Sequence, residues 1–175
     1  ASDVYKRQGT KKIQQILVGS GVLSQFVPKS VGEQLKAYFA MMFGLEEEVE
    51  GRTAREFLAE YAEQYVLKPQ REGGGNNVYG SEIRDFMTSL PTKEDRAWIA
   101  MKRIEAETTE SILVVQEEAQ YHQCISELGI FGLLRAQSGD LRINMPAGHL
   151  VRTKASNVNE GGVVAGYAGL NSLIS

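Results

Sequence analysis

The stretch KPQREGGGNN, from Lys68 to Asn77, combines residue types that suit the binding of a phosphate group. Its three glycines lack side chains that would keep a ligand away from the backbone, so main-chain N–H groups can point at phosphate oxygens. Lys68 adds a cation before the glycines, and Glu72 adds a carboxylate, a ligand type that Mg²⁺ prefers. Neither the Gly-Lys-Ser/Thr of a P-loop nor a G-x-G-x-x-G dinucleotide pattern occurs here. The stretch fits a magnesium–nucleotide cradle, and a plain surface hairpin loop fits its glycine content equally well.

A second glycine-rich stretch, NEGGVVAG from Asn159 to Gly166, follows the basic segment LVRTK. Two such loops, each with basic residues nearby, could fold over one ligand. Taken alone, the second stretch is more simply explained as an ordinary loop near the end of the chain.

Four other residues have side chains that could do chemistry. His122 and His149 are not spaced with other candidate ligands, so we expect structural roles for both. Cys124 lies in an apolar strand pattern and is expected to be a buried thiol rather than a nucleophile. Glu127 interrupts the apolar run CISELGIFG, and either faces solvent or binds a ligand.

Apolar periodicity predicts which elements carry these residues. Helical turns are expected over residues 10–27, with a break near Gly19 and Gly21. They start with the paired lysines Lys11 and Lys12, which we expect to be exposed. Further helices are expected over residues 30–45, 53–64 and 80–90, the second with Thr53 and Glu56 in a capping box, and the acidic run 46–51 is read as a solvated turn. Strands are expected over residues 65–70, 96–104, 121–136 and 141–155, with turns at 137–140 and 145–148, and the tail after 160 is read as a loop and a short helix. Helices followed by strands favour an α+β fold with an antiparallel sheet.

Composition limits the class of protein. The 175 residues fit one domain or two small ones, and 42% hydrophobic with 23% charged residues is typical of a soluble globular chain. A net charge of −3 argues against a nucleic-acid partner, and no apolar run is long enough to cross a membrane. A single cysteine suggests a reducing compartment, so we expect a cytoplasmic location.

The first eight residues, ASDVYKRQ, differ in character from the rest. The codons GATGTGTATAAGAGACAG, which resemble the transposase adapter of sequencing libraries, would encode DVYKRQ. We therefore expect residues 1–8 to be a translated adapter and residues 9–175 to be part of a longer protein.

Four motifs of the chain resemble the eukaryotic-type glutathione synthetases in their order and spacing. They are YVLKPQREGGGNNVYG, QCISELGIFG, GHLVRTK and NEGGVVAG, and GTKKIQQ at residues 9–15 resembles a further stretch of that family. The similarity covers nearly all of residues 9–175, and KPQREGGGNN is highly specific. It implies an ATP-grasp fold, incomplete here, with a mainly helical segment at residues 9–65 and a nucleotide-binding sheet with glycine-rich loops at residues 66–175.

The resemblance also implies a reaction. Members of the family are ligases that join γ-glutamylcysteine to glycine, with ATP as co-substrate, Mg²⁺ as cofactor and an acyl phosphate as intermediate. They are homodimers that act on small molecules, with no nucleic-acid or membrane partner implied.

Site residues follow from the same resemblance, position by position. The nucleotide-binding residues would be Lys11, Lys68, Glu72, Gly73, Gly74, Gly75, Asn76, Asn77, Tyr79, Met101, Lys102, Arg103, Ile104, Glu127, Lys154 and Glu160. The substrate-binding residues would be Arg152, Val163 and Val164, with Arg152 also the catalytic residue and Glu72 the metal ligand.

Two departures from the family pattern leave alternatives open. Lys102 stands in the adenine-contacting segment where relatives carry an acidic residue, and the pair Val163–Val164 does not clearly match a glycine-selecting lid. A homoglutathione-type synthetase and a free-standing nucleotide-binding module therefore remain alternatives. Because most of the peptide site and further metal ligands would lie upstream, we expect this chain alone to lack ligase activity.

Overall fold

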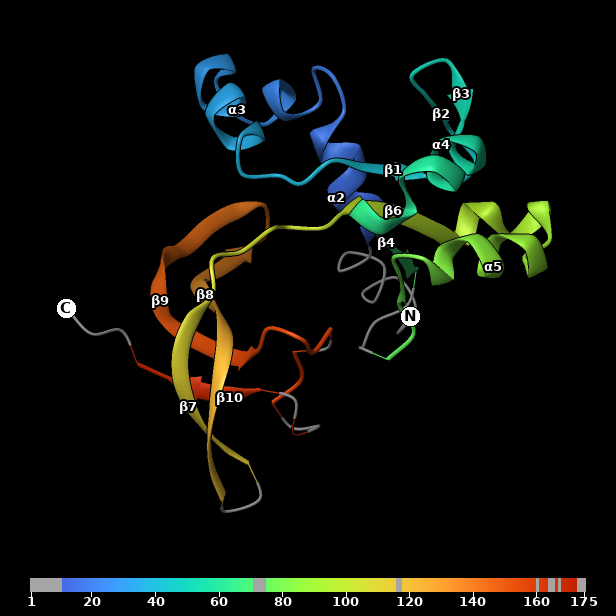
Figure 1. Cartoon of the computed structure of the whole chain (residues 1–175). Helices are drawn as coiled ribbons and strands as arrows, with labels where there is room; N and C mark the ends of the chain where they lie inside the picture. Colours follow the sequence, from blue (N-terminus) through green and yellow to red (C-terminus); the bar gives the residue numbers. More distant parts are fainter. Residues whose placement is uncertain are drawn as a thin grey trace. The chain divides into compact units, whose positions relative to one another are not determined.

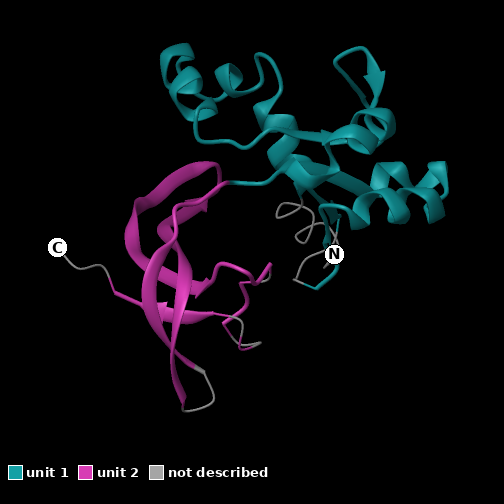
Figure 2. Cartoon of the chain, in the orientation of Figure 1, with its two compact units in different colours: residues 1–104 teal, residues 105–175 magenta. Residues whose placement is uncertain are grey.

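The computed structural model describes residues 11–70, 75–115, 118–159, 161–163, 166 and 168–172. The chain divides into two compact units, unit 1 (Ala1–Ile104) and unit 2 (Glu105–Ser175), shown in Figure 2. Every strand pair among these residues is antiparallel, which confirms the α+β class. Within the described ranges, no helix is both long and apolar enough to cross a membrane.

Unit 1 combines short helices with a four-stranded sheet (Figure 1). Its helices are α2 (Lys11–Val18), α3 (Lys29–Lys36), α4 (Ala54–Tyr61) and α5 (Glu82–Ser89), with 3₁₀ turns η1 (Leu23–Gln25), η2 (Ala62–Gln64) and η3 (Thr92–Ala97). Its strands are β1 (Met42–Gly44), β2 (Glu48–Val49), β3 (Arg52–Thr53), β4 (Tyr65–Pro69), β5 (Val78–Tyr79) and β6 (Trp98–Lys102). The four-stranded sheet has the order β1-β6-β4-β5, and β2 and β3 form a separate hairpin.

Helices α4 and α5 cover one face of this sheet. Phe43, Leu67 and Ala100 lie on that face and belong to one buried cluster with side chains of both helices. Phe43 packs edge-on against Phe57 of α4, with ring centroids 5.7 Å apart. Helix α4 begins at the expected capping box, in which the Thr53 hydroxyl accepts from the N–H of Glu56.

An ion pair ties the end of α5 and the turn η3 to α4. The Arg55 guanidinium donates to both carboxylate oxygens of Asp95, at 3.0 and 2.5 Å, and to the carbonyls of Met87 and Leu90 at 2.6 and 2.8 Å. Asp95 is buried, and Arg55 supplies bidentate hydrogen bonds to its carboxylate. Because η3 leads directly into β6, the pair also fixes where β6 begins.

Unit 2 is a four-stranded sheet of order β10-β9-β8-β7. Its strands are β7 (Thr109–Val115), β8 (Glu118–Gln137), β9 (Asp140–Ala155) and β10 (Gly169–Asn171), and β8 and β9 form a long curved hairpin (Figure 1). On one face, Cys124, Val151 and Thr153 are buried, and the Thr153 hydroxyl bonds to Ser126 Oγ at 2.8 Å. The expectation of a buried Cys124 thiol is confirmed.

The outer part of this hairpin leaves much apolar surface uncovered. Its exposed large side chains are Leu128, Ile130, Phe131, Leu133, Leu134, Leu141 and Met145. An apolar surface of this kind marks a contact region or an aggregation hazard.

Several predicted elements were wrong in extent or type. The helix expected over residues 30–45 ends at Lys36, because Met42 begins β1 and pairs with Met101 of β6. Tyr38, two residues after the end of α3, is 87% exposed. The acidic run does contain a turn, at Glu50 and Gly51, but it belongs to the β2–β3 hairpin and is not wholly solvated.

In unit 2, one predicted turn and one predicted helix were wrong in type. The turn expected at residues 145–148 is a bulge inside β9: Phe131 pairs with Gly148 and Gly132 with Pro146, which leaves Ala147 without a partner. The bulge accommodates Pro146, which has no N–H to donate to a neighbouring strand. The helix expected in the tail is, over its described residues 169–171, the strand β10 paired with β9.

Candidate functional site

Strand β4 carries Lys68 on the sheet face opposite to α4 and α5. Lys68 pairs with Ile99, while Val66 pairs with both Met101 and Tyr79, and paired residues project from the same face. Three residues predicted to bind nucleotide, Lys68, Tyr79 and Met101, therefore share one face of the sheet. The predicted residue Asn77 lies beside them and donates from Nδ2 to the Tyr79 hydroxyl at 3.1 Å.

The segment predicted to contact adenine continues from β6. The N–H of Lys102 donates to the Met41 carbonyl at 2.9 Å, and the N–H of Arg103 donates to the Gln64 carbonyl at 2.8 Å. These two N–H groups are held by the fold, so they are not available to a base. The side chains of Lys102, Arg103 and Ile104 are exposed.

The glycine-rich loop is described only at its two ends. Gln70 extends the sheet, because its N–H donates to the Ala97 carbonyl at 2.9 Å. Gly75 has a φ of +85° at the other end, where a side chain would be strained. The predicted residues Glu72, Gly73 and Gly74 lie outside the described residues.

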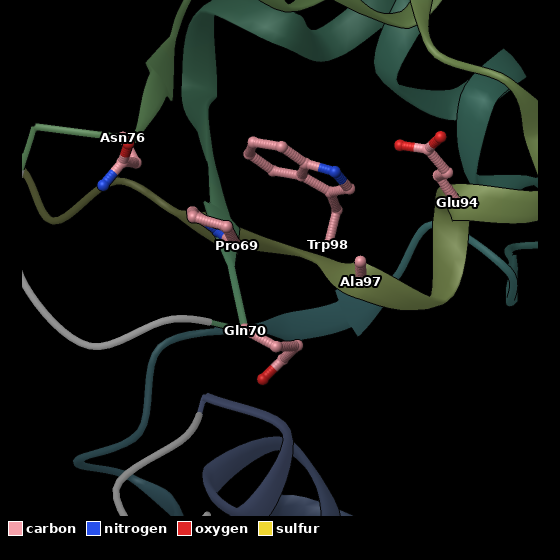
Figure 3. A pocket seen from close by; sticks show the side chains of 6 residues that line it. All are labelled: Pro69, Gln70, Asn76, Glu94, Ala97 and Trp98. Atoms are coloured by element: carbon pink, nitrogen blue, oxygen red, sulfur yellow. The ribbon is translucent and has the colours of Figure 1, made fainter. Parts of the chain in front are cut away.

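A pocket of about 260 Å³ flanks this loop (Figure 3). It is lined by Pro69, Gln70, Asn76, Glu94, Ala97 and Trp98. Pro69 and Trp98 pair across β4 and β6, so they project from the face opposite to Lys68. The pocket therefore contains the predicted residue Asn76 but lies on the other side of the strands from Lys68, the lysine predicted to bind phosphate.

Helix α2 begins with the two lysines that were expected to be exposed. Lys11 donates from Nζ to Gln14 Oε1 at 3.1 Å, and both lysines are half-buried. The expectation was wrong for Lys12, whose ammonium pairs with Glu46 at 2.9 Å and Glu47 at 3.2 Å. The N–H of Lys12 donates to Gln70 Oε1 at 3.1 Å, which connects α2 to the entry of the glycine-rich loop.

Unit 2 brings three predicted residues together on the other, more exposed face of its sheet. Glu127 pairs directly with Arg152, and Lys154 follows on the same face of β9. The Arg152 guanidinium donates to Glu127 Oε1 at 2.6 Å, and the side chains are 39% and 64% exposed respectively. Glu127 thus faces solvent, as one of its two readings expected, and its binding of a ligand stays a prediction.

Lys154 connects the strand to the second glycine-rich stretch. Its ammonium donates to the carbonyls of Val158 and Asn159, at 2.6 and 3.0 Å. Val163 lies further along and is half-buried, while Glu160 and Val164 lie outside the described residues. A cation at the start of this stretch can therefore set the direction in which the loop leaves β9.

Neighbouring groups shift the pKa values of Lys12 and Glu47. Burial alone would lower the pKa of Lys12, but the carboxylates of Glu46 and Glu47 outweigh it, so the pKa is raised. Burial would likewise raise the pKa of Glu47, but hydrogen bonds from Gln15, the Gly44 N–H and Lys12 hold it below its usual value. Sequence reasoning missed this role of Glu47, although the apolar residues Leu45 and Val49, on either side of Glu46, Glu47 and Glu48, could have indicated contact with the core.

A metal centre does not emerge from the described part of the chain. No group of three or more His, Cys, Asp or Glu side chains there is arranged to hold a metal ion. The predicted ligand Glu72 lies outside those residues, so its role stays a prediction.

The structure is an antiparallel α+β fold in which a lysine-bearing strand leads into a glycine-rich loop and a second sheet displays basic side chains. This is the fold of an ATP-binding protein of the ATP-grasp type. The family described as "Eukaryotic glutathione synthase, ATP binding domain" matches residues 1–174, and the chain belongs to this family.

Curated relatives agree with the family match. The chain is 41% identical over 173 residues to the chloroplastic glutathione synthetase of Solanum lycopersicum, covering 97% of this chain and 31% of the relative. It is 43% identical over 168 residues to the Homo sapiens glutathione synthetase, covering 94% of this chain and 35% of the relative. The chain thus spans about a third of the length of the curated relatives it matches.

A solved structure shows the same fold. It is the apo form of a glutathione synthetase-like effector from Globodera pallida, with a TM-score of 0.64 at 18% identity, covering 84% of this chain and 32% of that one.

Proposed function

We propose that this chain is the ATP-handling part of a ligase that joins γ-glutamylcysteine to glycine. The observation that carries the proposal is the shared sheet face of Lys68, Tyr79 and Met101, next to a glycine-rich loop, within a chain of this family. A cation, an aromatic ring and an apolar side chain on one face suit the phosphates and the base of one nucleotide.

The reaction has two steps. A carboxylate oxygen of γ-glutamylcysteine attacks the terminal phosphorus of ATP, ADP leaves, and an acyl phosphate forms. The amine of glycine then attacks the acyl carbon, phosphate leaves with the bridging oxygen, and the nitrogen loses a proton. The protein contributes position and charge, since a phosphoryl group in transfer carries dispersed negative charge.

Several of the predicted site residues have a part in this scheme. Lys68 and Lys11 attract phosphate oxygens, and the glycine-rich loop allows main-chain N–H groups to approach them. Glu72 would hold Mg²⁺, whose chemistry is to offset phosphate charge, and a carboxylate is a fitting donor for this hard cation. Arg152 binds a carboxylate of the peptide, for which its half-exposed guanidinium is accessible beside Glu127.

The test combines nucleotide binding with turnover. Lys68→Met should weaken ATP binding by roughly tenfold or more through loss of a charge-assisted contact. Lys36→Met, which removes a lysine of α3 paired with Glu33 on the surface, is the matched control. In the full-length protein, Glu72→Gln should reduce turnover sharply while the protein stays folded. Unchanged ATP binding in Lys68→Met would refute the assignment of this sheet face.

The proposal also covers the acceptor amino acid, the oligomeric state and location of the full-length protein, and the activity of this chain alone. We infer that glycine is the acceptor, that the full-length protein is a cytoplasmic homodimer, and that this chain alone forms no product. Assaying the full-length protein with glycine and with β-alanine separates a glutathione from a homoglutathione synthetase. Product formed from ATP, γ-glutamylcysteine and glycine by residues 9–175 alone would contradict the inference of inactivity, and a full-length protein that sediments as a monomer would contradict the dimer.

A further inference from the structure

We propose that Glu47 and Gln70 are positioning residues for the nucleotide site. Together they would hold α2, which begins at Lys11, against the end of β4, which carries Lys68. This inference rests on the proposed function, because it concerns the two lysines assigned there to phosphate. We call Glu47, Lys12 and Gln70 the brace.

Glu47 is the centre of the brace. Its Oε1 accepts from Gln15 Nε2 at 2.5 Å and from Lys12 Nζ at 3.2 Å, and its Oε2 accepts from the Gly44 N–H at 3.2 Å. Its carbonyl accepts from the Ala54 N–H, at the start of α4, at 3.0 Å. One residue thus connects α2, β1 and α4, although its sequence context is that of a surface turn.

Lys12 passes this connection on to the loop. Its ammonium is held by Glu46 and Glu47, and its main-chain N–H donates to Gln70 Oε1. Gln70 also lines the Trp98 pocket (Figure 3), and its Oε1 atom accepts from the N–H of Lys12 in α2. Lys12 is therefore held through both its side chain and its backbone, and Lys11 is its immediate neighbour.

Gln70 is held on its other side by the sheet. Its N–H bonds to Ala97, so the residue two positions after Lys68 cannot move without breaking a ladder hydrogen bond. The Gln70 Nε2 and Gln15 Oε1 atoms are buried, and neither has a hydrogen-bond partner within the described part of the chain. Unpaired buried amide atoms are unfavourable for stability, so we interpret the arrangement as serving position.

The consequence for binding is geometric. Lys11 and Lys68 come from elements far apart in the chain, and the hydrogen bond from the Lys12 N–H to Gln70 Oε1 connects those elements. Displacement of a positioning group by about 1 Å can cost as much as a hundredfold in function, so losing the brace should weaken nucleotide binding without removing a ligand-binding atom.

The experiment compares Glu47→Gln and Gln70→Leu with Glu60→Gln in the 175-residue chain. Glu60 is the control, because it also loses an ion pair, 2.7 Å to Arg52, on a surface of α4. Hydrogen exchange is followed in α2 and β4, and MgATP affinity is measured by calorimetry. Trp98 fluorescence in urea checks that each variant is folded, and Gln70→Leu keeps the test valid if Glu47→Gln does not fold.

We expect exchange in α2 to rise about tenfold and MgATP affinity to fall roughly five- to tenfold in both brace variants, with neither effect in Glu60→Gln. Faster exchange with unchanged affinity would overturn the positioning role while leaving the proposed function intact. Unchanged exchange would overturn the brace itself. A wild-type chain that bound no MgATP would refute the proposed function at this site, and exchange alone would then decide whether the brace couples α2 to β4.

Discussion

Replacing Asp95 by Asn tests whether the Arg55 ion pair holds unit 1 together. The change keeps the size of the side chain but replaces one accepting oxygen with an NH₂ group. Arg55 Nε or Nη2 would then face a donor, or the amide would rotate and lose one of the two hydrogen bonds. The two bonds from Arg55 to the carbonyls of Met87 and Leu90 would remain.

The expected loss can be worked from burial. Removing one member of a fully buried ion pair costs about 3–5 kcal/mol, and an exposed pair contributes about 0–1 kcal/mol. The Asp95 side chain is 10% exposed and that of Arg55 is 25% exposed, so the site lies nearer the buried limit. We expect a loss of about 2–3 kcal/mol, which corresponds to a fall in Tm of about 10 °C or more for a unit of this size.

Urea unfolding followed by tryptophan fluorescence measures this loss directly. Trp98 is the single tryptophan of the chain, follows η3 and packs against Phe86 at 4.5 Å, so it reports on unit 1. Glu60→Gln, at an exposed pair with Arg52, should leave the midpoint unchanged. A loss below about 0.5 kcal/mol in Asp95→Asn, or an equal loss in both variants, would refute the argument from burial.

Three further results are expected. The Glu47 carboxyl has a lowered pKa in the folded chain, so it stabilises the fold above its ordinary value of 4.5, and the effect is lost as pH falls through the lowered value. The stability difference between wild type and Glu47→Gln, measured by urea unfolding across pH, should therefore be constant near neutrality and shrink in acid. Burial raises the pKa of the Cys124 thiol, so a thiol reagent should modify the native chain at least about a hundredfold more slowly than the unfolded chain, and rapid stoichiometric labelling would contradict the buried site. In the full-length protein, Glu127→Gln should raise the KM for ATP without raising that for the peptide, because Arg152 stays in place and loses only an exposed partner. A rise for the peptide alone would assign Glu127 to holding Arg152.

Local signals in the sequence were enough for some elements. The capping residues Thr53 and Glu56 define the start of α4, and Pro69 ends β4, because each acts through its own neighbours. The strand β1 was missed because its apolar residues continue a helix-like period, and only pairing with β6 selects the extended form.

The sequence predicts the candidate site as a set of residues, whose roles stay predictions, and does not predict their arrangement. The resemblance pointed to Glu127 and Arg152 separately, but their 2.6 Å contact depends on the register of β8 and β9, which no local pattern specifies. Glu47 was read as solvated because a run of acidic residues usually is. Its donors come from α2 and from the backbone of β1, and sequence alone does not reveal that meeting.

The strand order of unit 1 has a consequence for synthesis on the ribosome. Strand β6 is the last strand of the unit to be made, yet it lies between β1 and β4 in the finished sheet. Until it emerges, β1 and β4 have no common neighbour and the nascent chain carries open strand edges. At about 5–20 residues per second, translation from β1 to the end of β6 takes roughly 3–12 seconds. Chaperones would be most needed in that interval, and slowing the ribosome before Trp98 should lower the yield of folded protein more than slowing it after Lys102.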